Sequence, residues 1–548
     1  SPPSAGLMAI VESFLVRADH ALASQRPTTV AMVSAGAAVA LALAWARWEE
    51  YARRPGGTTA AFLAWARSLP VVRGMVQREL GKVVAGLEEG MTEKEGPPLC
   101  RELPRTGAKA AEVLKLLEDT KSRDVSWSEG SSPLSGMVYV GDSSHMDLLS
   151  RAYSMFAHSN PLHSDVFPSV ARMEHEVCEM TASMLGGGAA GDPGVCGVMT
   201  SGGTESILTA LRAHRDLAYA TRGIVKPEMV ACRSAHAAVD KAAAYFGIRI
   251  RRVGTTSDWA MDARAAARAV NANTILIYAS APGYPHGVMD PIEALAAVAR
   301  RRGCGLHVDA CLGGFVLPFA RAAGWSDRLA PFDFSVPGVT SMSVDTHKFG
   351  LAQKGSSVCL FRTRELRKAQ FTGVTDWTGG LYVSPGQAGS RPGGLVAQTW
   401  AALMHKGFDG YTESARRILA CADRLAAGVE RIPQLAVMGQ HTMVVAIQSV
   451  DPNVNIYQVN DLMSAKGYHL NALQQPPSVH MCVTAAHSPE LIDRLLEHLA
   501  EAVAAVAADP KAGAGGMAPV YGLAGSIPDR GVVGDLLAEV QDLMLHHA

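Results

Sequence analysis

The chain has 548 residues, of which 48% are hydrophobic and 18% are charged, and its formal net charge is −1. This composition supplies enough apolar side chains for a large core and excludes a chain that is disordered throughout. The near-zero charge provides no excess of basic residues for a nucleic-acid partner, and we expect none. The nine cysteines form no CxxC pair and no Cys/His cluster with zinc spacing, so we also expect no metal site.

The first feature along the chain is an uncharged stretch of 19 residues, 28–46. Its length is close to the roughly 20 residues that cross a bilayer, and it predicts a single transmembrane helix. Four arginines follow the stretch by position 67 and two precede it, which favours a cytosolic location for the long C-terminal part. Because the stretch is rich in alanine and only mildly hydrophobic, a buried helix or an uncleaved signal-like segment is the alternative.

The composition divides the whole chain into five regions. We expect an anchor segment over 1–55, a helical arm over 56–135, a large domain over 136–405, a small α+β domain over 406–510 and a tail over 511–548. In the small domain, 443–447 and 479–483 are expected strands and 490–507 an amphipathic helix. A further amphipathic segment, 532–545, lies in the tail.

In the large domain, short apolar runs alternate with alanine-rich helical runs. The expected strands are 195–199, 228–231, 248–253, 274–278, 306–308, 341–344 and 357–361. The expected helices are 204–219, 237–246, 263–269 and 291–301. This alternation predicts an α/β fold with a mostly parallel sheet that is covered by helices on both faces. Ligands of such sheets bind beyond the carboxyl ends of the strands, so functional residues should follow the strands.

Two motifs follow the first two strands. In 200–206 (TSGGTES), the glycines allow an anion to approach the backbone, and Thr204 stands at a helix N-terminus, which attracts phosphate. His236 follows the next strand, where its ring can stack on a flat aromatic cofactor. Read alone, the glycine turn is an ordinary capped turn, and a single histidine is more often structural.

Two later strand ends carry ionisable groups. Asp309, in LHVDACLGGF, can pair with the ring nitrogen of pyridoxal phosphate and maintain the ring as an electron sink, or it can cap the next helix. Lys348, beside His347 in SVDTHKFG, is a candidate Schiff-base amine, because partial burial can supply a neutral lysine. A lone lysine would be a surface residue. The order of glycine turn, His, Asp and His-Lys is typical of fold-type I pyridoxal-phosphate enzymes.

From about residue 127 to 507 the chain resembles the sphingosine-1-phosphate lyases, within the group II decarboxylase-like branch. The matching stretches are GMVYVGD (136–142), SNPLHSDVFP (159–168), TSGGTESIL (200–208), SAHAAVDKAAAYFG (234–247), PHGVMDP (285–291), HVDACLGGF (307–315), DTHKFG (345–350), KGSS (354–357), TDWTGGLYVSP (375–385) and GSRPGG (389–394). TSGGTES, HVDA and HK are shared with amino-acid decarboxylases, whereas NPLH, KGSS and the last two stretches are typical of the lyases. Phe349 and Gln353 depart from the family pattern, which has Tyr and Pro there.

The resemblance implies roles for the matched residues around pyridoxal 5′-phosphate. Lys348 forms the covalent link, Asp309 pairs with the ring nitrogen and His236 stacks on the ring. The residues implied at the cofactor phosphate are Gly203, Thr204 and His347 and, across a homodimer interface, Ser390, Gly393 and Gly394.

On the substrate side the resemblance implies Tyr139, His163 and Lys354, with the catalytic acid or base among them, and Asn160 in support. The implied reaction is a retro-aldol cleavage of sphingosine or sphinganine 1-phosphate to a fatty aldehyde and phosphoethanolamine, in sphingolipid catabolism. The enzyme would be a homodimer in the endoplasmic reticulum membrane, held by its N-terminal helix, with the catalytic domain facing the cytosol. A pyridoxal-phosphate-dependent amino-acid decarboxylase of the same fold is the alternative.

Overall fold

The computed structural model describes residues 62, 63, 65, 69–91, 100–127, 132–139, 142–188, 191–509, 511–513 and 530–547. The predicted transmembrane segment, 28–46, lies outside these residues. Within the described part of the chain, none of the helices combines the length and the hydropathy that crossing a bilayer requires. Contacts divide the chain into two units, Ser1–Gly107 with Ser526–Ala548, and Ala108–Gly525.

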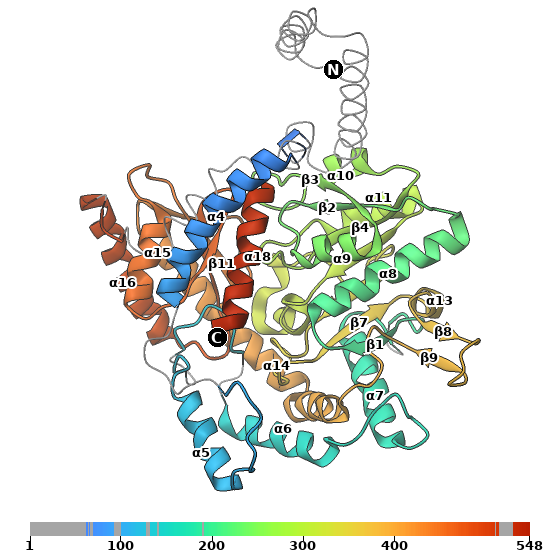
Figure 1. Ribbon diagram of the computed structural model, residues 1–548. Coiled ribbons are helices and arrows are strands. Elements are labelled where there is room, and N and C mark those ends of the chain that lie inside the picture. The colour runs from blue at the N-terminus through green and yellow to red at the C-terminus, as the bar shows by residue number, and fades with distance from the viewer. Residues whose placement is uncertain are drawn as a thin grey trace, which may run out of the picture. The chain divides into compact units, whose positions relative to one another are not determined.

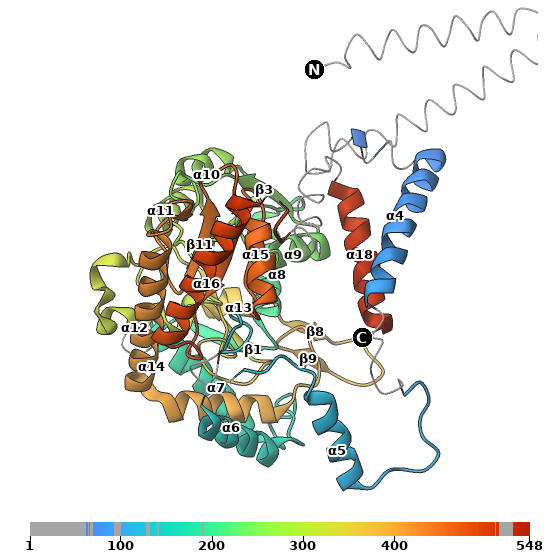
Figure 2. The ribbon, with the colours of Figure 1, turned by 90° about the vertical axis from the view of Figure 1, so that its left-hand side faces the viewer.

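The first unit contains two described helices, α4 (Pro70–Met91) and α18 (Arg530–His547), which pack side by side (Figures 1 and 2). Helix α18 includes the amphipathic segment predicted at 532–545. The second unit begins with α5 (Ala110–Lys121), in which every residue is exposed, followed by α6 (Ser143–Phe156) and α7 (Pro168–Met184).

The main sheet has seven strands in the order β1-β7-β6-β5-β4-β2-β3. They are β1 (Cys196–Thr200), β2 (Glu228–Cys232), β3 (Arg249–Val253), β4 (Thr274–Ser280), β5 (Gly305–Asp309), β6 (Ser341–Val344) and β7 (Ser357–Phe361). All seven predicted strands are present, and the predicted mostly parallel sheet is confirmed. Only β7 runs against the others, because it pairs antiparallel with both β1 and β6.

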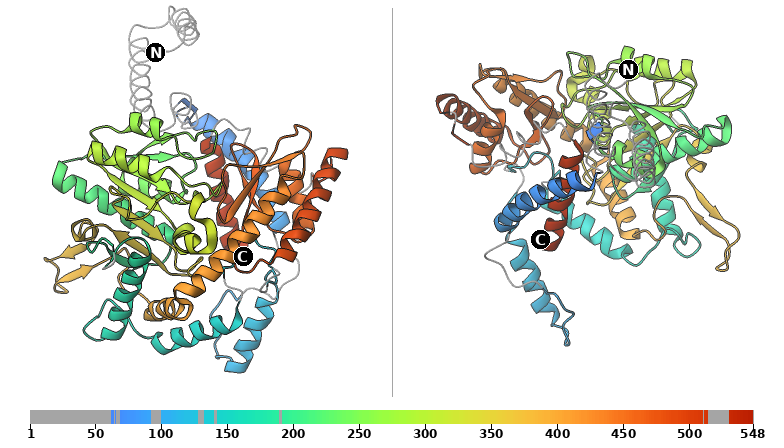
Figure 3. Two further views of the ribbon diagram at one scale, coloured as in Figure 1. Left: turned by 180° about the vertical axis from the view of Figure 1, so that it is seen from behind. Right: turned by 45° about the horizontal axis from the view of Figure 1, so that its top comes forward.

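Helices cover both faces of this sheet (Figures 1 and 3). On one face, α8 (Gly203–Arg222) and α9 (Ala238–Phe246) bury aliphatic side chains against β2 and β4. On the other, α7, α10 (Ala263–Ala269) and α11 (Ile292–Arg302) join the largest core cluster. Successive strand residues point to opposite faces, so a strand with helices on both sides must be apolar throughout, as β4 nearly is.

A series of short elements follows β5 and β7. They are η1 (Gly313–Phe315), α12 (Leu317–Ala320), η2 (Arg321–Trp325), η3 (Ser326–Arg328), α13 (Arg364–Lys368), β8 (Thr372–Val374) and β9 (Tyr382–Ser384). Strands β8 and β9 form a separate two-stranded sheet, which projects at the right edge of Figure 1.

Helix α14 (Gly393–Val429) bends at Gly407 (φ 58°, ψ −177°) and leads into a smaller α+β part of the second unit. Its antiparallel sheet has the order β10-β11-β13-β12, formed by β10 (Leu435–Val437), β11 (Val444–Ser449), β12 (Asn471–Leu473) and β13 (Ser478–Cys482). Helices α15 (Ile456–Ala465) and α16 (Pro489–Ala508) pack together beside it (Figure 2).

Candidate active site

A cavity of about 370 Å³ lies beyond the carboxyl ends of the main parallel strands. Small-molecule sites typically have volumes of roughly 300–1,000 Å³. Six of the residues predicted from the sequence line this cavity: Gly203, Thr204, His236, Asp309, His347 and Lys348. The sheet therefore brings together motifs that lie up to 145 positions apart in the chain.

The glycine turn forms one wall. Strand β1 ends at Thr200 and α8 begins at Gly203, so the first amides of a 20-residue helix border the cavity. Gly203 has no room for a side chain, because a Cβ there would lie 2.7 Å from Cys311 Sγ and 2.9 Å from both carboxylate oxygens of Asp345. The free N–H groups of a helix N-terminus favour an anion at this wall.

His236 lies between β2 and α9. Its Nδ1 accepts a hydrogen bond from the amide of Ala238 (3.1 Å), which leaves the proton of a neutral ring on Nε2. Tyr284 meets the ring edge-on, with 6.0 Å between centroids. The ring is therefore held in place at the rim of the cavity.

Asp309 closes β5 and is only 8% exposed. Its Oδ1 accepts from the Cys311 amide and the Ser343 hydroxyl (3.0 Å each), and its Oδ2 accepts from the Tyr278 hydroxyl (2.5 Å). Burial alone would raise the pKa of Asp309, but the nearby His236 and the hydrogen bonds from Cys311 and Tyr278 outweigh burial and lower it. Asp309 is therefore a carboxylate at neutral pH.

Lys348 follows β6, and its Nζ lies 2.8 Å from Oδ2 of Asp345, a carboxylate with 1% exposure. Burial alone would lower the pKa of Lys348, but the charge of Asp345, with smaller contributions from Cys311 and Tyr139, raises it. Oδ1 of Asp345 accepts no hydrogen bond from any described residue. The amine is therefore an ammonium whenever it carries no covalent link. The expectation that partial burial supplies a neutral lysine here is wrong, because the charge of Asp345 outweighs burial.

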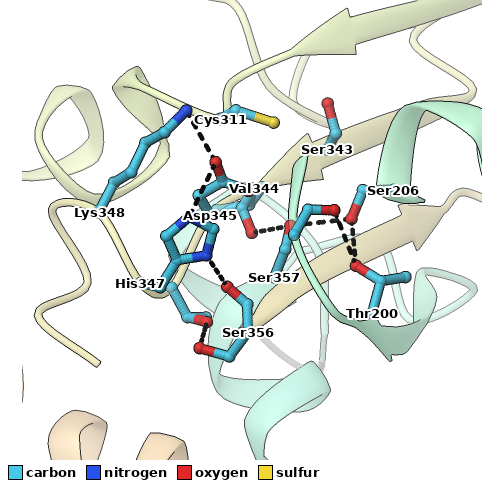
Figure 4. A network of polar contacts seen from close by, with 12 residues as sticks. Thr200, Ser206, Cys311, Ser343, Val344, Asp345, His347, Lys348, Ser356 and Ser357 are labelled. Atoms are coloured by element: carbon cyan, nitrogen blue, oxygen red, sulfur yellow. Dashed lines mark hydrogen bonds and ion pairs between the residues drawn. The ribbon is translucent and has the colours of Figure 1, made fainter. Parts of the chain in front are cut away.

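His347 lies on the other side of Asp345, with its Nε2 3.8 Å from Oδ2 of that carboxylate. Its Nδ1 bonds to the carbonyl oxygen of Ser356, as Figure 4 shows. Burial is the main cause that lowers the pKa of His347, so its ring is neutral near pH 7. Since Nδ1 then donates to the carbonyl, Nε2 is an acceptor.

A chain of buried hydroxyls joins the glycine turn to β7 (Figure 4). Thr200 Oγ1 lies 2.6 Å from Ser206 Oγ, which lies 2.8 Å from Ser357 Oγ, and Ser357 donates to the carbonyl of Val344 (3.0 Å). These bonds connect the ends of β1, α8, β7 and β6. They fix the anion-binding turn relative to the Lys348 loop.

Tyr139 and Lys354 lie beside Lys348, outside the set of residues that line the cavity. Lys354 Nζ is 4.7 Å from the centroid of the Tyr139 ring, and that ring packs edge-on against Phe349 at 4.9 Å. Burial raises the pKa of Tyr139, whereas burial and the charge of Lys348 lower the pKa of Lys354. Phe349, where the family pattern has tyrosine, acts here as a buried packing partner.

The other predicted residues form a separate loop cluster, made of Asn160, His163, Ser390, Gly393 and Gly394. Oδ1 of Asn160 accepts from the amides of Leu162 and Arg391 (3.1 Å each), and the Gly393 amide donates to the carbonyl of Ser159 (2.8 Å). A Cβ at Gly393 would lie 2.7 Å from Ser159. None of the five cluster residues lines the cavity described above.

Sequence reasoning missed Asp345, Tyr278 and Cys482. Asp345 could have been predicted as a partner of Lys348, because it lies three positions before Lys348 in DTHKFG. Tyr278 had none, because a tyrosine in an apolar strand is ordinary core. Cys482 comes from the small α+β part and meets the Tyr139 hydroxyl only through the tertiary fold.

The donor set fits pyridoxal 5′-phosphate. Glycine-turn amides suit a phosphate, Lys348 supplies an amine for its aldehyde, and Asp309 supplies a buried carboxylate for the ring nitrogen. His236 lies where it can cover the face of the ring. Residues 101–447 match the family model described as the pyridoxal-dependent decarboxylase conserved domain. The fold and the cavity thus define a pyridoxal-phosphate-dependent enzyme of the decarboxylase-like class.

Comparison with known proteins narrows the class. The chain is 49% identical over 478 residues to a sphingosine-1-phosphate lyase of Oryza sativa subsp. japonica, covering 86% of this chain and 87% of the relative. The solved sphingosine-1-phosphate lyase of Burkholderia pseudomallei is 41% identical, with a TM-score of 0.72, covering 76% of this chain and 95% of that one. A glutamate decarboxylase of Lactobacillus brevis shares the fold alone, at 19% identity and a TM-score of 0.64, covering 76% and 96%.

The chain belongs to the sphingosine-1-phosphate lyase family. It is a lyase that uses pyridoxal 5′-phosphate, and the family places it in sphingolipid metabolism.

Proposed function

We propose that the protein cleaves the C2–C3 bond of a phosphorylated long-chain sphingoid base, such as sphingosine or sphinganine 1-phosphate. The products are a fatty aldehyde and phosphoethanolamine. The observation that supports this substrate is the second amine, Lys354, beside Lys348, since a phosphorylated substrate needs a cation in addition to the amine that binds the cofactor. The high identity to proteins named sphingosine-1-phosphate lyases supports the same choice.

Bound pyridoxal 5′-phosphate supplies the electron sink for the pair that is released when this bond breaks. Lys348 Nζ would hold the cofactor covalently. Asp345, 2.8 Å from Nζ, would stabilise the ammonium form of Lys348 when the amine is not linked. Asp309 would accept a hydrogen bond from the N–H of the ring nitrogen, and the amides at Gly203 and Thr204 would bind the phosphate.

Tyr139 and Lys354 have different roles in binding the substrate and moving its proton. Lys354 offers a positive charge to the substrate phosphate. In its neutral form, which the lowered pKa makes more accessible, Lys354 would instead be the better proton acceptor of the two. Tyr139, whose pKa is raised, stays protonated and can donate a hydrogen bond. His163 is the third candidate for the transfer of the C3-hydroxyl proton.

We further propose that two copies of the chain form a homodimer in which the loop cluster of one copy completes the cavity of the other. The location of the cluster outside its own cavity supports this arrangement. So does the exposed apolar surface on the β8–β9 hairpin, where Trp377 is 56%, Leu381 86% and Val383 65% exposed. Ser390, Gly393 and Gly394 would then reach the partner's cofactor phosphate.

We also propose that residues 28–46 anchor the enzyme in the endoplasmic reticulum membrane, with the catalytic part in the cytosol. The uncharged stretch and its arginine-rich C-terminal flank support this location. A long-chain substrate partitions into bilayers, so an anchored enzyme meets it at high local concentration.

Product analysis tests the reaction directly. Purified protein with a phosphorylated long-chain base should release a fatty aldehyde and phosphoethanolamine, identified by mass spectrometry. Release of CO2 from an amino acid without any aldehyde would contradict the lyase proposal and favour a decarboxylase.

A further inference from the structure

Three neighbouring strands carry polar side chains on one face of the main sheet. Tyr278 in β4 lies opposite His307 in β5, which lies opposite Ser341 in β6, and two positions on, Asp309 lies opposite Ser343. Asp309 is 8% exposed and the other four are 0% exposed. We call these five residues the polar stripe. Buried polar groups destabilise a core unless they are hydrogen-bonded, so a stripe of them calls for an explanation.

The hydrogen bonds of the stripe have a fixed direction. Ser343 donates its only hydroxyl proton to Asp309 Oδ1 (3.0 Å), so its oxygen must accept from His307 Nε2, which lies 3.2 Å away. Burial lowers the pKa of His307 to about 3, so the ring is neutral and carries one proton, on Nε2. Nδ1 then accepts from Ser341 at 2.8 Å. Each donor in this series of hydrogen bonds, from Ser341 through His307 to Ser343, therefore points toward Asp309.

The hydrogen bonds of the polar stripe occupy most of the acceptor sites of the Asp309 carboxylate. A carboxylate offers about four lone-pair sites. Among the described residues, Cys311 and Ser343 use both sites of Oδ1, and Tyr278 uses one site of Oδ2. The thiol of Cys311, a weak donor, also contacts the carboxylate. The remaining site of Oδ2 can therefore take a stronger donor, on a side chain that lines the cavity. Three inward-pointing donors also disfavour a proton on the carboxyl group itself, because hydrogen bonds to the charged form stabilise that form.

We propose that Tyr278, Ser343 and His307 are positioning residues that hold Asp309 ionised, with a single acceptor site for the ring nitrogen of the cofactor. Their effect is to keep the shared proton on the ring nitrogen, where it supports the electron sink, and off the carboxylate. This inference rests on the proposed placement of the cofactor against Asp309. It adds a second layer of three residues, none of which touches the cavity.

The test uses holoenzyme loaded with cofactor that carries 15N in its ring. In Tyr278→Phe the carboxylate becomes more basic, so the ring-nitrogen NMR signal should move toward the position of an unprotonated pyridine. The matched control is Tyr457→Phe, which removes another buried tyrosine hydroxyl, bonded to the Leu473 carbonyl (2.6 Å) in the small α+β part. The control should leave the signal unchanged.

Ser343→Ala provides a second, independent variant, since it removes a donor from the other carboxylate oxygen and should shift the signal in the same direction. It carries the test if Tyr278→Phe does not fold. Signals from both variants that coincide with the Tyr457→Phe signal would overturn the inference. A protein that binds cofactor covalently but releases no aldehyde would instead contradict the proposed function and leave this measurement intact.

Discussion

The residues of the cavity wall and those of the loop cluster were both predicted from sequence motifs, but they lie in different places in the structure. The residues of the wall follow β1, β2, β5 and β6, and all face one cavity of about 370 Å³. In the loop cluster, Asn160 and His163 lie between α6 and α7, Ser390 lies between β9 and α14, and Gly393 and Gly394 begin α14. Hydrogen bonds tie the segments 159–163 and 389–394 to each other.

This difference shows for which sequence motifs the position in the folded chain can be predicted. Parallel strands end at one edge of a sheet, so a motif that follows such a strand must meet the others. A segment that does not follow a strand of this parallel sheet has no such constraint. Its partner is decided by tertiary or quaternary packing, which a local motif does not encode.

The largest expected effect comes from the amine at the centre of the cavity wall. Lys348→Ala should reduce product release to background and abolish covalent trapping of the cofactor by borohydride, because no other amine lines the described cavity. Peptide mapping after reduction checks this in the wild type. Cofactor found on Lys354 would show that the two lysines had been assigned in the wrong order.

The next largest effect is expected at Asp309. Asp309→Asn preserves the shape of the side chain but removes the charge that stabilises a protonated ring nitrogen. We expect kcat to fall by about two to three orders of magnitude, typical for loss of a preorganised electrostatic group. Steady-state kinetics measure the loss, and a variant within threefold of wild type would contradict the role of Asp309.

A smaller change is expected when the neighbour of Lys348 loses its charge. Asp345 raises the pKa of Lys348, and only the neutral amine can capture the cofactor aldehyde. In Asp345→Asn the pKa of Lys348 falls, so the midpoint of capture against pH should move down by about one unit or more. Rapid mixing of apoprotein with cofactor at several pH values gives the midpoint. Asp240→Asn, which removes an exposed partner of Arg252, is the control and should leave it in place.

The smallest effect tests the loop cluster. Lys348→Ala and His163→Ala are each expected to be inactive, but unfolding and refolding them together should restore roughly a quarter of wild-type activity. Half of the random dimers are then hybrids with one intact site of two. Lys348→Ala mixed with Asp309→Asn is the control, and it should restore nothing because both residues belong to one wall. Equal recovery in both mixtures would place the loop cluster in its own chain's cavity.

The strands of the main sheet could be predicted because each is a short apolar run between polar or glycine-rich segments. The predicted 341–344 and 357–361 coincide with β6 and β7, and the others differ by one or two residues at their ends. The direction of β7 and its place between β1 and β6 could not be predicted, since an apolar run is the same in either direction. Strands β8 and β9 were missed because each has three residues, most of them partly or fully exposed.

The residues of the site likewise include some that could be predicted from the sequence and some that could not. Gly203, His236, Asp309 and Lys348 were predictable as strand-end residues. The surroundings of Tyr139 were not, because its segment is held by the small α+β part, where the amide of Gly136 donates to the carbonyl of Cys482 (2.9 Å). That contact joins positions 346 residues apart, and no local sequence pattern predicts it.

The reversed direction of β7 has a consequence for how the enzyme can change. The chain leaves β6 at Val344 and enters β7 at Ser357, so both lysines stand on one short connection without a crossover helix. The proposed attachment of the cofactor to Lys348 and the proposed recognition of the substrate's charged end by Lys354 would therefore be coupled through this connection. Lengthening this connection by a residue would alter the spacing between them, which makes it a natural place to retune the enzyme for head groups of another size.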